Sequence, residues 1–165
     1  MKLQKKQNFM SRVGGAEEQE IIDLQSYYKI TLLDDYKHFL KSFGFCAWFG
    51  DYICGLPEES FRFKKSLSVY NKTNYFIDFY KEHELQAVSK RGVIINKYDG
   101  GGYYFLFSKE SGRAGEVGLF LTETYGQEVS KFKSFTDYLS FLVTGTPDPE
   151  PVDVDYDKII DIIED

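Results

Sequence analysis

Three short runs of β-branched and aromatic residues, separated by glycine-rich segments, place the strongest constraint on the fold of this chain. The runs cover residues 92–98, 103–107 and 117–122, and the segments between them are residues 99–102 and 108–115. Apolar runs of this length, bounded by turn-forming residues, are typical of β-strands, and such brief connections favour antiparallel pairing. The sequence therefore predicts an antiparallel β-meander in this part of the chain.

Two helices are predicted near the N-terminus. Residues 17–28 place apolar side chains at helical spacing behind several acids, which suit the positive end of a helix dipole. A second helix follows the capping-box-like pair Thr31 and Asp34 and ends at Gly44. Because glycine tolerates positive φ, we expect Gly44 to end this helix in a left-handed conformation.

The rest of the chain alternates between short strands and helices. Residues 45–56 contain brief aromatic runs around glycines, which favour short strands with tight turns, and residues 69–83 return to helical spacing. Ser134 and Asp137 form a second capping pattern ahead of a final helix, which should stop near Gly145.

The C-terminal segment differs in composition from the rest of the chain. Alternate prolines in residues 146–151 predict a stiff extended linker. Residues 144–165 hold eight acids against one lysine, a charge of −7, so the remaining chain carries +1 of the total of −6. Isoleucines at helical spacing beyond the linker allow two interpretations, a short docking helix or a segment that folds back or frays.

Length and composition indicate one domain with appendages. The chain has 165 residues, of which 42% are hydrophobic and 18% aromatic, enough for one substantial core. We expect a flexible basic arm over residues 1–16, a folded domain over residues 17–143, and a linker with an acidic tail over residues 144–165. A nearly neutral body gives no electrostatic reason to expect nucleic-acid binding.

The sequence points to a cytoplasmic protein. No apolar stretch suits a signal peptide or a membrane span, because charged residues interrupt every apolar run. Cys46 and Cys54 lie in apolar surroundings, so we expect reduced, buried thiols in a reducing compartment.

The motifs that suggest catalysis or metal binding also have structural explanations. The glycines at 100–102 lie between predicted strands and lack the lysine and helix of a phosphate-binding loop, which favours a hairpin turn. The cysteines and two histidines show no metal-ligand spacing, and we expect neither a metal nor a cofactor. A Cys–His pair or a pair of carboxylates remains open as catalytic machinery, but two histidines supply little acid–base chemistry near neutral pH.

One aromatic segment is the first candidate for a partner-binding site. Most rings in residues 43–52 should be core, yet alternating strand faces must leave some outside, and exposed Trp or Tyr beside an acid is typical of a binding hot spot. We therefore single out Trp48, Asp51 and Tyr52. Further candidates lie in the meander and the tail: Asp99, Tyr103, Glu116, Tyr156, Asp157 and Ile160.

Several short motifs resemble the SUKH superfamily, the Smi/Knr-type domain of bacterial immunity proteins and fungal cell-wall regulators. They are Leu32-Leu-Asp-Asp-Tyr-Lys-His-Phe-Leu40, Ile53-Cys-Gly-Leu56, Val69-Tyr-Asn-Lys-Thr-Asn74, Gly115-Glu116-Val117 and the helix at residues 135–142. Their order and spacing are similar to those of the superfamily from about residue 17 to 143. The Asn-Lys-Thr-Asn segment and the acidic tail look most like the YobK type.

The resemblance implies an α+β domain with helices packed against a central, mainly antiparallel sheet. It also implies an immunity protein, not an enzyme, that binds a cognate toxin domain and blocks it, with a basic nuclease as one candidate partner. We expect no nucleic-acid or membrane partner, and a monomer or weak homodimer. The alternative within the superfamily is a regulatory scaffold with several partners, and an enzyme ranks third.

Overall fold

The computed structural model describes residues 10–48, 51–59, 61, 64–82, 91–124 and 126–154. The helices are α1 (Glu18–Tyr28), α2 (Asp34–Phe43), α3 (Lys64–Leu67), α4 (Val69–Glu82) and α5 (Phe135–Thr144). The strands are β1 (Met10–Ser11), β2 (Cys46–Trp48), β3 (Asp51–Ile53), β4 (Gly92–Tyr98), β5 (Gly102–Phe107), β6 (Val117–Leu121), β7 (Gln127–Phe132) and β8 (Glu150–Pro151). Two short 3-10 helices, η3 (Lys109–Ser111) and η4 (Thr122–Thr124), flank β6.

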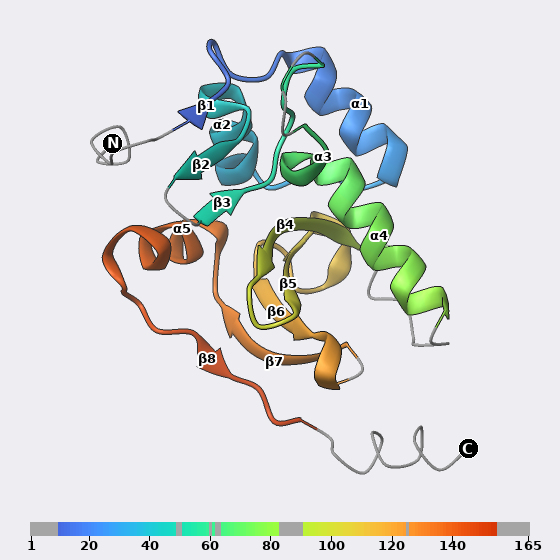
Figure 1. The fold of residues 1–165 in the computed structure, drawn as a ribbon, viewed down its shortest axis with the longest axis vertical. Helices are drawn as coiled ribbons and strands as arrows, with labels where there is room; N and C mark the ends of the chain where they lie inside the picture. Colours follow the sequence, from blue (N-terminus) through green and yellow to red (C-terminus); the bar gives the residue numbers. More distant parts are fainter. Residues whose placement is uncertain are drawn as a thin grey trace.

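A five-stranded antiparallel sheet with the order β4-β5-β6-β7-β8 forms the largest layer of the molecule (Figure 1). Its first three strands are the predicted meander, and their antiparallel pairing is confirmed. The turn between β4 and β5 uses Gly101 at φ 86°, as expected for a glycine-rich hairpin. The combination of helices with antiparallel sheets confirms the α+β class.

Both faces of this sheet are covered by helices. On one face, Phe76 of α4 packs 5.7 Å from Phe105 and 6.0 Å from Phe120, measured between ring centroids. Successive strand residues point to opposite faces, so Tyr104 lies on the other side and packs 4.7 Å from Tyr138 of α5. The central strand β5 is consequently buried along its whole length.

A smaller sheet, ordered β1-β2-β3, joins the N-terminal helices to the large sheet. The backbone N–H of Cys54, just after β3, donates to the carbonyl of Ile95 in β4 at 2.7 Å. The Tyr36 hydroxyl of α2 donates to the Cys54 carbonyl at 2.9 Å. These two bonds satisfy a buried backbone segment and tie both sheets to α2.

The start of α2 differs from the prediction, because Thr31 and Asp34 form no capping box. The N-cap is Leu33, which has no side-chain capping bond. A capping box is found instead at α1, where Glu17 and Glu20 each accept the other's backbone N–H. Glutamate side chains are long enough for this reciprocal arrangement, and the acids suit the positive end of the helix.

Gly44 ends α2 at positive φ, as expected, but in a tighter turn than the left-handed helical cap. Its φ and ψ are 65° and −51°, and the N–H of Phe45 donates to the carbonyl of Phe43 at 2.6 Å. These angles and this bond describe a γ-turn with positive φ. The turn reverses the chain directly from α2 into β2.

The C-terminal helix matches the prediction, whereas the segment predicted as a linker also forms a strand. The Ser134 hydroxyl accepts the N–H of Asp137, and Gly145 caps α5 in the left-handed conformation. The proline-containing segment then pairs as β8 along the edge of β7, where Glu150 is opposite Lys131. It is therefore part of the sheet and not only a spacer.

Besides β8, strands β1 and β7 were not predicted. The side chains of β7 are only half-buried for most of its length, so its sequence carries no strong apolar pattern. The residues of β1 fall in the segment expected as a basic arm, and they pair with Ala47 and Cys46 of β2. None of the helices in the described part of the chain is long and apolar enough to cross a membrane.

Candidate functional site

The structure places the predicted interface residues at different depths. Trp48 lies in β2 with only 4% of its surface exposed, inside the main core. Tyr103 of β5 is 6% exposed, whereas Asp51 and Asp99 are exposed and Tyr52 is half-buried. The remaining candidates Tyr156, Asp157 and Ile160 lie outside the described residues.

Tyr52 is the point at which several of these candidates meet. Burial raises the pKa of its hydroxyl well above the usual value, and the nearby Asp99 and Tyr103 add to the effect. The ammonium of Lys72 lies over the Tyr52 ring, 5.9 Å from the centroid. Asp51, Tyr52, Asp99 and Tyr103 therefore belong to one region, where the small sheet meets β4 and β5.

Glu116 belongs to a separate network at the other end of β5 from Tyr103. Its carboxylate accepts a hydrogen bond from Nε of Arg113 at 2.7 Å and lies 3.6 Å from the ammonium of Lys131. Arg113 also donates to both carboxylate oxygens of Glu128 and lies 4.1 Å above the ring of Phe107. These charges neutralise one another, so Glu116 has partners within its own domain.

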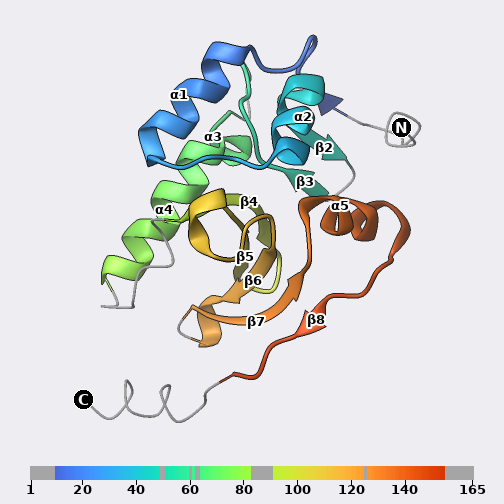
Figure 2. The same ribbon diagram turned by 180° about the vertical axis from the view of Figure 1, so that it is seen from behind.

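A surface rich in tyrosine lies where the C-terminal end of α1 meets the first turns of α4 (Figures 1 and 2). We call it the tyrosine surface, and it consists of Tyr27 from α1 and Tyr70, Asn71, Asn74 and Tyr75 from α4. Tyr27 and Tyr75 are 60% and 62% exposed, which is high for large aromatic side chains. Its composition is that of protein-binding hot spots.

The helical repeat explains why these side chains face outward. Val69, Thr73, Phe76 and Tyr80 form the buried stripe of α4. Asn71 and Tyr75 are four residues apart on the opposite side of the helix and are exposed. Because the stripe faces the sheet, the α4 residues out of phase with it face solvent.

Hydrogen bonds and ring contacts hold the tyrosine surface in place from below. The hydroxyl of Tyr28 donates to the carbonyl of Tyr70 at 3.1 Å or to Oδ1 of Asn74 at 2.9 Å. The side-chain amide of Asn74 donates to the hydroxyl of Tyr27 at 3.4 Å. The rings of Tyr27 and Tyr70 meet edge to face at 5.3 Å. A pre-ordered aromatic surface loses little entropy when a partner binds.

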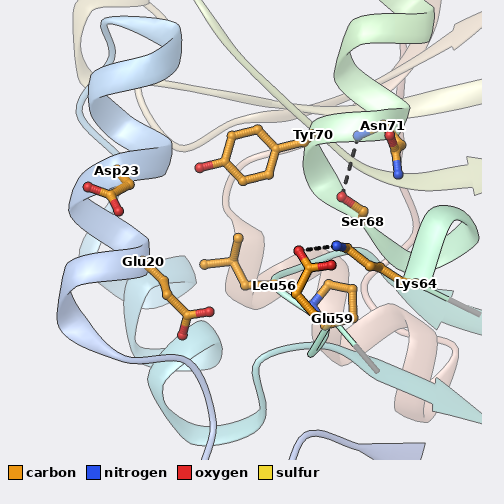
Figure 3. Close-up of a pocket in the computed structure, with 9 residues that line it drawn as sticks. Glu20, Asp23, Leu56, Glu59, Lys64, Ser68, Tyr70 and Asn71 are labelled. Carbon is orange, nitrogen blue, oxygen red and sulfur yellow. Dashed lines mark hydrogen bonds and ion pairs between the residues drawn. The ribbon is translucent and has the colours of Figure 1, made fainter. Parts of the chain in front are cut away.

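An acidic pocket of 350 Å³ opens on one side of the tyrosine surface, between α1 and the start of α4 (Figure 3). Glu20 and Asp23 line it from α1, and Tyr70 extends its hydroxyl toward them from α4. Burial raises the pKa of Tyr70, and Asp23 and Glu20 add to the effect, so the hydroxyl stays protonated. The other lining residues are Leu56, Pro57, Glu59, Lys64, Ser68 and Asn71.

Two of the three carboxylates in this pocket already have cationic partners. Lys64 forms an ion pair with Glu59 (Figure 3). Nη1 of Arg12 donates to Glu20 at 2.7 Å, and this bond lowers the pKa of Glu20 against the opposing effect of partial burial. Asp23 has no cationic partner among the described residues and accepts a neutral hydrogen bond from the amide of Gln19 at 2.8 Å. The pocket therefore keeps an excess of negative charge.

A basic groove of 420 Å³ opens on the other side of the tyrosine surface. Asn71 lines both the pocket and the groove. The groove's other lining residues are Lys65, Ser66, Lys72, Tyr75, Lys97 and Tyr103. Burial raises the pKa of Tyr103 to about 12, so its hydroxyl adds no negative charge near neutral pH.

The cysteines and acids of the described residues form no reactive cluster. Burial raises the pKa of Cys46 and of Cys54 to about 12, so both remain thiols at neutral pH and are poor nucleophiles. Both are free, as expected. In the described ranges no group of three or more His, Cys, Asp and Glu side chains could hold a metal ion.

Sequence reasoning missed the tyrosine surface although its signal was present. The periodicity of residues 17–28 and 69–83 indicates which side of each helix is buried, and Tyr27 and Tyr75 fall outside both apolar stripes. What the sequence does not indicate is that α1 and α4 lie next to each other. Only that packing joins two exposed tyrosines into one surface.

Comparison with known proteins supports the resemblance read from the short motifs. Residues 15–140 match the SMI1 / KNR4 family (SUKH-1). This range contains the whole tyrosine surface, the acidic pocket and the basic groove. No curated protein matches the chain. Because the match covers most of its length, the chain belongs to the SMI1 / KNR4 family (SUKH-1).

Proposed function

We propose that this chain is a cytoplasmic immunity protein that binds a cognate bacterial toxin domain through the tyrosine surface and neutralises it. The observation that carries the proposal is the pair of highly exposed tyrosines, Tyr27, which accepts a hydrogen bond from Asn74, and Tyr75, whose ring contacts that of Tyr103. Family membership supports a protein partner, because immunity proteins are part of the superfamily that the chain resembles.

The acidic pocket gives this surface a second means of recognition. A lysine or arginine side chain of the toxin would enter beside Asp23, whose carboxylate lacks a cationic partner within the described residues. Opposite charges at an interface speed association and reject wrong partners. A nuclease, which needs cationic side chains to hold nucleic acid, is a toxin of suitable chemistry.

Neutralisation in cells tests the proposal. The toxin domain is taken from the gene adjacent to the one for this protein and expressed with and without it. We expect growth to be restored by the intact chain, and the purified toxin domain to lose its activity at a one-to-one ratio.

Two results would contradict the proposal. One is stable binding with full toxin activity. The other is similar, weak binding to several unrelated proteins, which would indicate the regulatory scaffold instead. Circular dichroism of the purified chain distinguishes a folding defect from failure to neutralise.

A further inference from the structure

The lysines of the basic groove differ from most other lysines in having no acidic partner within the described residues. The described residues include eleven lysines, and seven of them form ion pairs. Lys65, Lys72 and Lys97 form none with other described residues, and all three line the basic groove. The fourth lysine without an ion pair, Lys29, lies elsewhere. Three of the four described lysines without an ion pair thus lie around one groove.

Each of the three lysines comes from a different element of regular structure. Lys65 lies on α3, Lys72 on α4 and Lys97 on β4. The ring of Tyr52 lies beneath the ammonium of Lys72, which restricts its position. The backbone therefore holds three cations around one groove before any partner arrives.

The rest of the groove supplies neutral groups that suit carboxylates. The lining includes the hydroxyl of Ser66, the amide of Asn71 and the hydroxyls of Tyr75 and Tyr103, and none of its described residues carries a carboxylate. Hydroxyl and amide groups donate hydrogen bonds to an anion without competing for the lysines. An anionic ligand is thus the chemistry that the groove fits.

The charges on either side of the groove favour a short acidic segment over a long polyanion. Glu20 and Asp23 line the neighbouring acidic pocket, and Asp99 lies near Tyr52, whose ring is beneath Lys72; Asp51 precedes Tyr52 in β3. The backbone of a nucleic acid is uniformly negative and would run from the groove toward these carboxylates. A protein surface can place its acids in the groove and other side chains outside it.

We propose that the basic groove binds a short acidic segment of a protein partner. This proposal rests on the proposed function, since the partner that binds the tyrosine surface would also cover the basic groove. It adds the chemical class of the partner's segment that enters the groove. The segment carries two or three Asp or Glu side chains that contact Lys65, Lys72 and Lys97.

A fluorescein-labelled decaglutamate peptide is the probe, titrated with the full chain at low ionic strength and followed by fluorescence anisotropy. The test variant is Lys65→Gln/Lys72→Gln/Lys97→Gln. The matched control is Lys29→Gln/Lys81→Gln/Lys109→Gln, which removes the same charge outside the groove. Circular dichroism establishes that both variants remain folded.

We expect the groove variant to bind the peptide roughly tenfold more weakly than the parent and the control to stay within about twofold, since each surface contact is individually weak. Equal losses in both variants, or no binding by the parent, would overturn the proposal. So would tighter binding of a labelled thymidine decanucleotide through the same three lysines, which would assign the groove to nucleic acid.

The outcome is distinguishable from failure of the proposed function. If the peptide does not bind but the toxin is neutralised, only the proposal for the groove is contradicted. If the peptide binds through the groove lysines but the toxin is not neutralised, the proposal for the groove is supported and the immunity role is contradicted.

Discussion

Gly44 combines a backbone requirement with a steric one. Its φ of 65° is strained for any side chain, and a Cβ at this position would lie 2.8 Å from Cβ of Arg12. Arg12 itself is fixed, because its guanidinium bonds to Glu20 and to the carbonyl of Leu56. The sequence predicted the first requirement from the end of the apolar pattern. The second depends on packing of the N-terminal segment and was not predictable.

Replacing Gly44 with Val should lower the free energy of unfolding by more than about 1 kcal/mol, because both the turn and the contact with Arg12 are disturbed. The control is Gly112→Val. Gly112 also has positive φ, 77°, but a Cβ there would meet no atom within 4 Å. Urea denaturation of the three proteins measures the difference. Equal losses in the two variants would contradict the steric contribution at Gly44.

Trp48 shows what composition cannot decide about a single residue. The sequence predicts a short aromatic strand around Trp48 but does not indicate whether its side chain faces the core or solvent. The strand is too short for an alternating pattern to be clear. All three residues of β2 are buried, since the small sheet lies between helices and the large sheet. Its position in the core was one of the two interpretations that the sequence allowed.

At the scale of elements, local signals predicted helices and the meander well. Ser134 and Gly145 indicated the two ends of α5. The apolar periodicity of α4 predicted which of its residues are buried. The prediction was weakest where an element is stabilised by a distant partner. β7 has a polar sequence, and β8 contains prolines, yet both are held by pairing with β6 and with each other.

The edge strand β8 is an element that its own sequence does not predict, because a distant strand stabilises it. Prolines in residues 147–151 correctly indicate an extended chain, and proline is tolerated at a sheet edge, where its missing N–H is not needed. The N–H of Val152 donates to the carbonyl of Val129 at 2.9 Å, and Lys133 pairs with Glu150 at 3.1 Å. These contacts between segments far apart in the sequence could not be read from the linker alone.

Two truncations separate the role of β8 from that of the acidic tail. Ending the chain after Val154 keeps β8, and we expect a thermal midpoint within about 1 °C of the parent's. Ending it after Gly145 removes the pairing with β7, and we expect a midpoint lower by several degrees, as about 1 kcal/mol would produce in a domain of this size. Identical midpoints for the two truncated chains would contradict a stabilising role for β8.

Over the whole molecule, charge is arranged more finely than the net value of −6 suggests. The nearly neutral body carries an acidic pocket and a basic groove on either side of one tyrosine surface. Composition indicated the excess of acids in residues 144–165 but not the separation of an acidic pocket from a basic groove. That separation arises because α1, α3, α4 and β4 bring residues from 20 to 97 together.

The measurement that tests the central claim most directly is the dissociation constant of the toxin domain for three forms of the chain. They are the parent, Tyr75→Ala and the control Tyr98→Ala, which removes a tyrosine that is 41% exposed outside the tyrosine surface. Isothermal titration should show binding about thirtyfold weaker for Tyr75→Ala, as expected for a hot spot of about 2 kcal/mol, and an unchanged constant for Tyr98→Ala. An unchanged constant for a folded Tyr75→Ala variant would contradict the account.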